Sequence, residues 1–143
     1  GGVDPKLLDK VRQYATSIYL EEPILKLTGA ISGDEVAIHM KDCDAVLLFS
    51  RKENFPCVIA EAWACGKPVI TTDVGGIAEH MHDERGILIK SDDEKALAQA
   101  ILNLDKDWNE EAIRKYAVDV FSVEAVSKSY SEAYTIALKS IND

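Results

Sequence analysis

Two glutamates flank the start of a predicted helix, and they are the first candidates for chemistry in this sequence. Glu53 lies in the loop after an apolar run, and Glu61 follows eight residues later, inside the helix that Pro56 opens. The N-terminus of such a helix offers unpaired N–H groups and the positive end of the helix dipole, so this region can hold an anion. Glu61 stands between Ala60 and Ala62 in a stretch predicted to be buried. A carboxylate there needs a partner, which is either a nearby cation or N–H group or a bound ligand.

The other reactive side chains fit structural roles. Cys43, Cys57 and Cys65 form no C-x-x-C pair, and no histidine cluster accompanies them. We therefore expect reduced thiols in a cytoplasmic protein and no metal site. His80 and His82 lie near the end of a short predicted helix, where surface or capping roles are more common than that of a general base.

The predicted elements place the Glu53 loop at one edge of a parallel sheet. Apolar or β-branched runs predict strands at residues 24–28, 44–50, 68–72 and 86–89. Helices are predicted at residues 5–19, 33–41, 56–65, 77–81, 92–104, 110–118 and from 122 to the end. This alternation predicts an α/β fold with a Rossmann-like parallel sheet of about four strands and helices on both faces. Ligands of such sheets bind at the carboxyl ends of the strands, where the Glu53 loop lies.

Polar residues mark several of the helix starts. Asp4 precedes Pro5 in the way that an N-cap precedes the first residue of a helix. Residues 32–35 and 91–94 both have the Ser-x-x-Glu spacing of a capping box, which predicts helices that begin at Ser32 and Ser91.

Length and composition fit one globular domain and exclude several classes of protein. The 143 residues carry a net charge of -9, and 47% of them are apolar. Such a chain can bury a core without staples, and its acidic balance argues against a general nucleic-acid binder. No apolar run reaches the roughly 20 residues of a membrane span, and the first residues do not form a signal peptide. The chain lacks an initiator Met, so we expect it to have been processed or cut from something longer.

The segment around the two glutamates carries a specific resemblance. Residues 50–79 read SRKENFPCVIAEAWACGKPVITTDVGGIAE, which contains E-x7-E, then G-x-P-V-I, and finally V-G-G-x-x-E. This pattern resembles the donor-binding core of the retaining glycosyltransferases of family 4, also called group 1, which have the GT-B fold. The resemblance extends from about Tyr19 through the final helix. It implies that residues 1–143 are a single nucleotide-sugar-binding domain, the C-terminal half of a two-domain enzyme.

The resemblance also implies roles for individual residues. Glu53 matches the glutamate beside the transferred sugar and is the candidate catalytic residue. Glu61 matches the glutamate that hydrogen-bonds the ribose hydroxyls, and a carboxylate can accept from both. The stretch that approaches the sugar and diphosphate, largely through main-chain N–H groups, is Asn54, Phe55, Pro56, Cys57 and Val58. The loop that would cradle the base is Thr28, Gly29 and Ile31.

The implied reaction transfers a sugar from a nucleotide sugar to an acceptor hydroxyl with retained configuration. No cofactor or metal is expected, since the nucleotide sugar is a substrate. The family's G-R-x-x-x-x-K-G segment, whose cations neutralise the diphosphate, has no counterpart here. We therefore expect that the first two strands and the acceptor-binding domain are missing, and that the chain is inactive alone. Any peripheral membrane contact would come from the absent domain. Arg51 and Lys52 remain near the donor loop, where solvated loop charges are more common than diphosphate ligands.

The missing strands have a consequence for the sheet. In the usual strand order of this fold they separate the third strand from the fourth. The strand at 24–28 is therefore predicted either to pair directly with 44–49 or to leave the sheet for a partner chain. An exposed edge at 44–49 would favour self-association.

Other interpretations stay open. A nucleotide-sugar epimerase of similar fold would need His and Asp bases that the sequence does not place, and a non-catalytic nucleotide-sugar-binding module would need none. Residues 42–44 have the D-x-D spacing of a metal motif in another glycosyltransferase fold, but they stand at the wrong end of a predicted strand. No G-x-G-x-x-G follows a strand, which argues against a dinucleotide oxidoreductase. Trp63 at helical spacing from Ile59 indicates core packing rather than a sugar platform.

Overall fold

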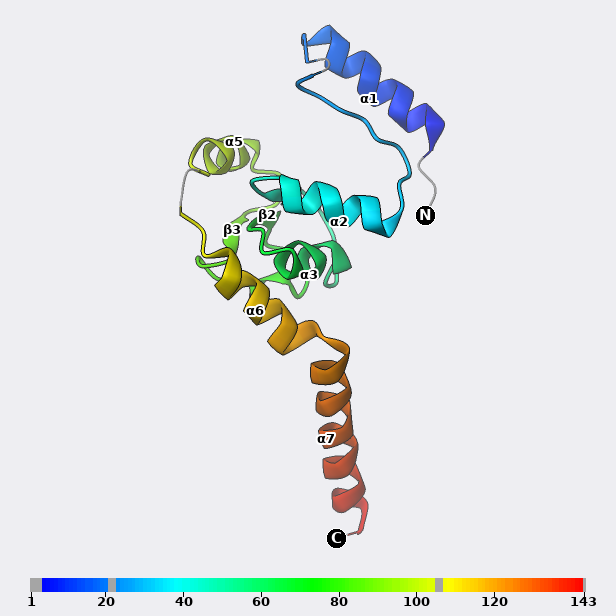
Figure 1. Cartoon of the computed structure of the whole chain (residues 1–143), viewed down its shortest axis with the longest axis vertical. Coiled ribbons are helices and arrows are strands. Elements are labelled where there is room, and N and C mark those ends of the chain that lie inside the picture. Colours follow the sequence, from blue (N-terminus) through cyan, green and yellow to red (C-terminus); the bar gives the residue numbers. More distant parts are fainter. Residues whose placement is uncertain (1–3, 21–22, 105–106, 143) are drawn as a thin grey trace. The chain divides into compact units, whose positions relative to one another are not determined.

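The computed structural model describes residues 4–20, 23–104 and 107–142, which form seven helices and three short strands (Figure 1). The chain divides into two compact units, residues 1–36 and 37–143. The elements in chain order are α1 (Pro5–Ser17), α2 (Gly33–Asp42), β1 (Val46–Leu48), α3 (Cys57–Ala64), β2 (Val69–Thr72), α4 (Ile77–His80), β3 (Gly86–Ile89), α5 (Glu94–Leu102), α6 (Glu110–Phe121) and α7 (Val123–Asn142).

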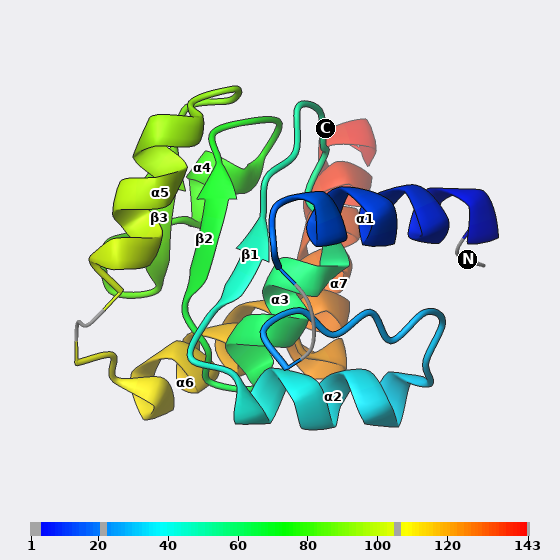
Figure 2. The ribbon, with the colours of Figure 1, turned by 90° about the horizontal axis from the view of Figure 1, so that it is seen from above.

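The three strands form a parallel sheet in the order β1-β2-β3 (Figure 2). The side chains of successive residues in β2 point to opposite faces of the sheet, as in any strand. Val69 packs with α3, α4 and α6 in one core, while Ile70 packs with Ile89 and α5 in a second core. All four residues of β2 are buried, as its continuous β-branched run predicts. The predicted α/β class, with a parallel sheet and helices on both faces, is confirmed.

The strand predicted at residues 24–28 does not form. Residues 23–30 are turn and irregular backbone, so the described residues give a sheet of three strands rather than about four. Of the two predicted alternatives, direct pairing with residues 44–49 is wrong, because residues 24–28 form no strand, while pairing with a partner chain stays a prediction. A strand persists only where its N–H and C=O groups find a ladder partner, and β1 has its ladder with β2 alone. Apolar and β-branched composition therefore does not make residues 24–28 a strand.

The helix starts follow the capping rules at most positions. The Asp4 carboxylate accepts from the Lys6 N–H at 2.9 Å, ahead of α1. Ser32 and Glu35 form the predicted capping box, with the Glu35 N–H donating to the Ser32 hydroxyl and the Ser32 N–H donating to the Glu35 carboxylate. α5 differs from the prediction, because its N-cap is Asp93 rather than Ser91.

Asp93 replaces Ser91 as the cap because its carboxylate accepts from the Ala96 N–H at 2.9 Å. We expect Asp93→Ala to lower the free energy of unfolding by about 1 kcal/mol, since it leaves an orphan donor in the first turn of α5. Ser91→Ala is the matched control and should change stability by only a few tenths. Urea unfolding of both variants checks this, and equal losses would contradict the assignment of the cap.

Candidate functional site

Three loops meet at the carboxyl edge of the sheet. The loop after β1 is tied to β2 by a hydrogen bond from the Thr72 hydroxyl to the Ser50 carbonyl at 2.6 Å. It is tied to the next loop by a bond from the Gly76 N–H to the Asn54 carbonyl at 2.7 Å. Its Arg51 also pairs with Asp92, which follows β3, at 2.6 Å. The E-x7-E segment and the V-G-G segment, separate in the sequence, are therefore neighbours in the fold.

The approach of the two loops depends on Gly75. Its φ is +61°, in the left-handed region. A Cβ built on Gly75 would lie 2.1 Å from the Glu53 carbonyl oxygen and 2.5 Å from that of Asn54. No side chain fits in that space, so this close approach requires glycine.

Glu53 is held within its own loop. Its carboxylate accepts a hydrogen bond from the Ser50 hydroxyl at 2.9 Å, and its side chain is half-buried. That contact leaves the second carboxylate oxygen without a protein partner among the described residues, so Glu53 keeps the capacity to accept from a sugar hydroxyl.

Glu61 is exposed, and the prediction that it is buried and needs a partner is wrong. The helix turns its apolar face inward through Ile59, Ala62 and Trp63, which places Glu61 on the opposite side. No described residue forms an ion pair or side-chain hydrogen bond with it. Its carboxylate borders a shallow depression of about 250 Å³ whose other walls come from α3 and from the junction of α6 and α7. It is therefore available to a ligand.

The start of α3 offers backbone donors. Pro56 is the N-cap and contributes no N–H, and the Ile59 N–H already bonds to the Pro56 carbonyl at 3.1 Å. The N–H groups of Cys57 and Val58 have no acceptor among the described residues, as expected for the first turn of a helix. Asn54 and Cys57 are exposed there, while Val58 packs partly against the core.

The Phe55 side chain faces inward. Its ring stacks on Phe121 at 5.2 Å between centroids and meets the edge of His80 at 4.9 Å. Its role in the predicted site thus rests on its backbone, because the ring belongs to an aromatic cluster that also holds Trp63. Trp63 is fully buried, which confirms the prediction of core packing.

A buried arginine completes this cluster, and no sequence pattern predicted it. The Arg85 guanidinium lies 3.6 Å from the centre of the Tyr116 ring and donates to the His80 carbonyl at 3.0 Å. His80 Nδ1 and the Tyr116 hydroxyl are hydrogen-bonded at 2.9 Å. These contacts join α4 to α6, and they correct the prediction of a surface or capping role for His80, which is half-buried among the rings.

The remaining predicted residues belong to the other unit or carry surface charge. Thr28, Gly29 and Ile31 belong to the unit of residues 1–36, and their predicted contact with a base stays a prediction. Arg51 and Lys52 are exposed, as expected of loop charges. Within the described ranges, no three His, Cys, Asp or Glu side chains are grouped to hold a metal ion.

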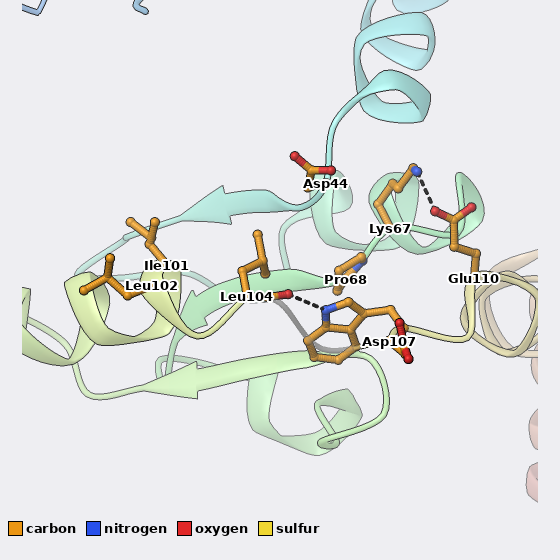
Figure 3. Close-up of a pocket in the computed structure, with 9 residues that line it drawn as sticks. Asp44, Lys67, Pro68, Ile101, Leu102, Leu104, Asp107 and Glu110 are labelled. Carbon is orange, nitrogen blue, oxygen red and sulfur yellow. Dashed lines mark hydrogen bonds and ion pairs between the residues drawn. The ribbon is translucent and has the colours of Figure 1, made fainter.

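A larger hollow of about 610 Å³ lies at the amino end of the strands (Figure 3). It is bordered by Asp44 and Pro68, which precede β1 and β2, and by Trp108. On its rim, Lys67 pairs with Glu110 at 2.6 Å, so its cation is already neutralised. The sequence did not predict this hollow. The strand ends that carry the E-x7-E and V-G-G loops are at the opposite edge of the sheet.

The three thiols differ in exposure, which gives a prediction for their chemistry. Burial raises the pKa of Cys43, although nearby Lys67 opposes the shift, and Cys57 is exposed at the start of α3. Because the thiolate is the reactive form, iodoacetamide at pH 8 should modify Cys57 well before Cys43. Peptide mass spectrometry of timed samples checks this order, and faster modification of Cys43 would contradict it.

None of the helices in the described part of the chain is both long and apolar enough to cross a membrane.

Comparison with known proteins gives a consistent result. The sequence model of the family described as "Glycosyl transferases group 1" matches residues 2–107. An uncharacterized glycosyltransferase of Methanocaldococcus jannaschii is 37% identical over 113 residues, which are 78% of this chain and 31% of that protein. The N-acetyl-alpha-D-glucosaminyl L-malate synthase of Bacillus anthracis is 32% identical over 135 residues, which are 90% of this chain and 35% of that protein. The chain thus spans about a third of the length of these curated relatives.

Solved structures agree with the sequence matches. Sucrose-phosphate synthase from Thermosynechococcus elongatus superposes with a TM-score of 0.82 at 26% identity, covering 98% of this chain and 38% of that one. Anabaena HepE, solved in complex with UDP, superposes with a TM-score of 0.76 at 27% identity, covering 90% of this chain and 36% of that one. The family match covers more than half of the sequence, and the GT-B-like fold agrees with it. This chain belongs to the group 1 glycosyltransferases.

Proposed function

We propose that this chain is the donor-binding part of a family 4 retaining glycosyltransferase, which transfers a sugar from a nucleotide sugar to an acceptor hydroxyl in glycan, lipid or polysaccharide biosynthesis. The observation that carries the proposal is the junction of the E-x7-E and V-G-G segments, held by the bond from the Gly76 N–H to the Asn54 carbonyl. HepE, which has been solved with UDP and with UDP-glucose, supports a nucleoside diphosphate as the ligand.

In the proposed site, three parts of the donor contact three different groups of the protein. The ribose hydroxyls bond to the exposed Glu61 carboxylate. The diphosphate faces the N–H groups of Cys57 and Val58 at the positive end of α3. The transferred sugar lies beside Glu53, which is oriented by Ser50.

In the proposed reaction, the bond from the sugar to the diphosphate breaks and negative charge develops on the departing diphosphate. Donors already aimed at that charge lower the barrier most. The chain contributes helix N–H groups, while the basic G-R-x-x-x-x-K-G segment that neutralises the diphosphate in family members has no match in its sequence. We therefore propose that residues 1–143 bind the donor as a single domain and do not complete transfer alone.

The proposal is tested by thermal unfolding with UDP, GDP and ADP added in turn. A ligand of the native state raises the unfolding temperature, and at 100 times its dissociation constant it stabilises by about 2.7 kcal/mol. We expect one of the three to do so. Glu61→Gln should weaken that nucleotide about tenfold or more, because a charged acceptor of two hydroxyls is replaced by a neutral amide.

Glu84→Gln is the matched control, since Glu84 is another exposed glutamate, in the turn before β3 at the opposite edge of the sheet, and the proposal gives it no donor contact. No shift with any of the three nucleotides would refute donor binding by this chain. Equal loss from both glutamine variants would refute the role of Glu61.

A further inference from the structure

We propose that Phe121, the last residue of α6, is a positioning residue for the donor site. Its ring holds the ring of Phe55, and this contact fixes the backbone of the loop that precedes α3. The consequence for binding rests on the proposed function. The consequence for the loop itself rests only on contacts between described residues.

Phe55 is the inward anchor of its loop. The Asn54 side chain is exposed and Pro56 has no N–H to donate, so beside the backbone bond from the Gly76 N–H to the Asn54 carbonyl the Phe55 ring is the contact of this stretch with the aromatic cluster. The Phe55 ring contacts side chains from three helices: Phe121 of α6 at 5.2 Å, His80 of α4 at 4.9 Å and Trp63 of α3 at 6.4 Å. The contact with Phe121 is the stacked one, with ring planes 20° apart.

Phe121 is itself firmly held. Its ring stacks on Trp63 at 6.2 Å and meets His80 and Tyr116 at their edges, at 5.0 and 6.1 Å. A hydrogen bond joins two of these neighbours, His80 and Tyr116, to each other. The Phe121 ring is thus held in place, and the Phe55 side chain of the loop packs against it.

The same residue also stands next to the second candidate ligand contact. α6 ends at Phe121, and the chain bends at Ser122, whose backbone is extended (φ -63°, ψ 156°). Phe121 and Ser122 border the shallow depression that Glu61 borders from α3. Phe121 therefore contacts Phe55 in the Glu53 loop and also borders the depression beside Glu61. Because both places are proposed to contact the donor, we expect a change at Phe121 to alter donor affinity.

The first test measures the loop without any ligand, by backbone hydrogen exchange of the whole chain followed by mass spectrometry. Phe121→Leu keeps an apolar side chain but removes the stacked ring. We expect exchange of the Ile59 and Gly76 amides, which donate to the Pro56 and Asn54 carbonyls of the loop, to rise about tenfold, the scale of one aromatic pair, while the strands β2 and β3 keep their protection. Ile70→Val is the control, since Ile70 is buried in the second core, apart from the cluster of aromatic rings, and the substitution lowers stability. Phe121→Tyr keeps the ring and should restore slow exchange.

The second test is a double-mutant cycle on the affinity for the nucleotide that stabilises the chain. Phe55→Leu and Phe121→Leu should each weaken binding about tenfold, and the double variant should be little weaker than either one. Ile70→Val should bind as tightly as the parent chain.

Each outcome has a separate meaning. Unchanged exchange of the Ile59 and Gly76 amides in Phe121→Leu would overturn the positioning role, whether or not any nucleotide binds. A uniform rise across the sheet would also overturn it, because that is the signature of a merely structural residue. Fully additive losses in the cycle would show that the two rings act separately. Failure of the parent chain to bind any nucleotide refutes the proposed function and leaves the exchange result to decide the positioning role.

Discussion

Gly75→Ala is expected to remove nucleotide binding altogether. The added Cβ would lie 2.1 Å from the Glu53 carbonyl oxygen and 2.5 Å from that of Asn54, and both obstacles are backbone atoms that cannot rotate away. The left-handed φ of +61° adds strain of about 1–2 kcal/mol for any residue with a Cβ. The loop that carries Glu53 must therefore move away from the V-G-G loop, which also breaks the bond from the Gly76 N–H to Asn54.

Gly76→Ala is the control for this prediction. Its Cβ would meet the Asn54 carbonyl oxygen at 3.5 Å, an ordinary contact, and its φ of -86° suits alanine. Calorimetric titration should show parental affinity for Gly76→Ala and no binding for Gly75→Ala, with circular dichroism showing that both chains are folded. Parental affinity in a folded Gly75→Ala chain would mean that the junction of the two loops does not form the site.

Trp63→Ala is expected to have the largest effect on stability. Trp63 is fully buried, donates its indole N–H to the Arg85 carbonyl at 3.0 Å, and contacts the rings of Tyr116 and Phe121. Removing it should cost about 3–5 kcal/mol from the cavity alone, a large share of the roughly 5–15 kcal/mol that stabilises a typical domain.

Trp63→Phe separates the two contributions. It keeps an aromatic ring in the core and removes only the indole N–H from the Arg85 carbonyl, which still accepts from the Val69 N–H at 3.1 Å, so it should cost about 1 kcal/mol. Urea unfolding followed by circular dichroism measures both variants. A loss below about 1 kcal/mol for Trp63→Ala would contradict the central place of this side chain in the core.

The elements that could be predicted are those whose cause is local. The run of β-branched residues in β2 and the Ser32–Glu35 capping box act within a few residues of themselves, and both formed as expected. The cap of α5 was a local error of two residues, because Asp93 takes the place of Ser91. The missing strand has a non-local cause. Residues 24–28 have apolar, β-branched composition but pair with no strand, and pairing depends on what lies beside a segment rather than on its composition.

The candidate site likewise has features that the sequence predicts and features that it does not. The spacing of Glu53 and Glu61 was visible in the sequence, but the orientation of Glu61 was misjudged, because flanking alanines do not reveal which face of a helix is buried. Arg85, Tyr116 and Phe121 come from elements far along the chain, and only the packing of α4 and α6 brings them to Phe55. A buried arginine held by rings and a carbonyl, rather than by a carboxylate, has no signature in the sequence.

The proposed function requires that a nucleoside diphosphate bind at the carboxyl edge of the sheet. The backbone amide spectrum of the 15N-labelled chain, recorded during titration with UDP, GDP and ADP, shows whether it does. We expect one nucleotide to shift the amides of residues 53–55, 57, 58, 61, 75 and 76, around the start of α3 and the V-G-G loop. Shifts gathered instead around Lys67 and Trp108, at the hollow on the opposite edge, or no shifts with any of the three, would contradict it.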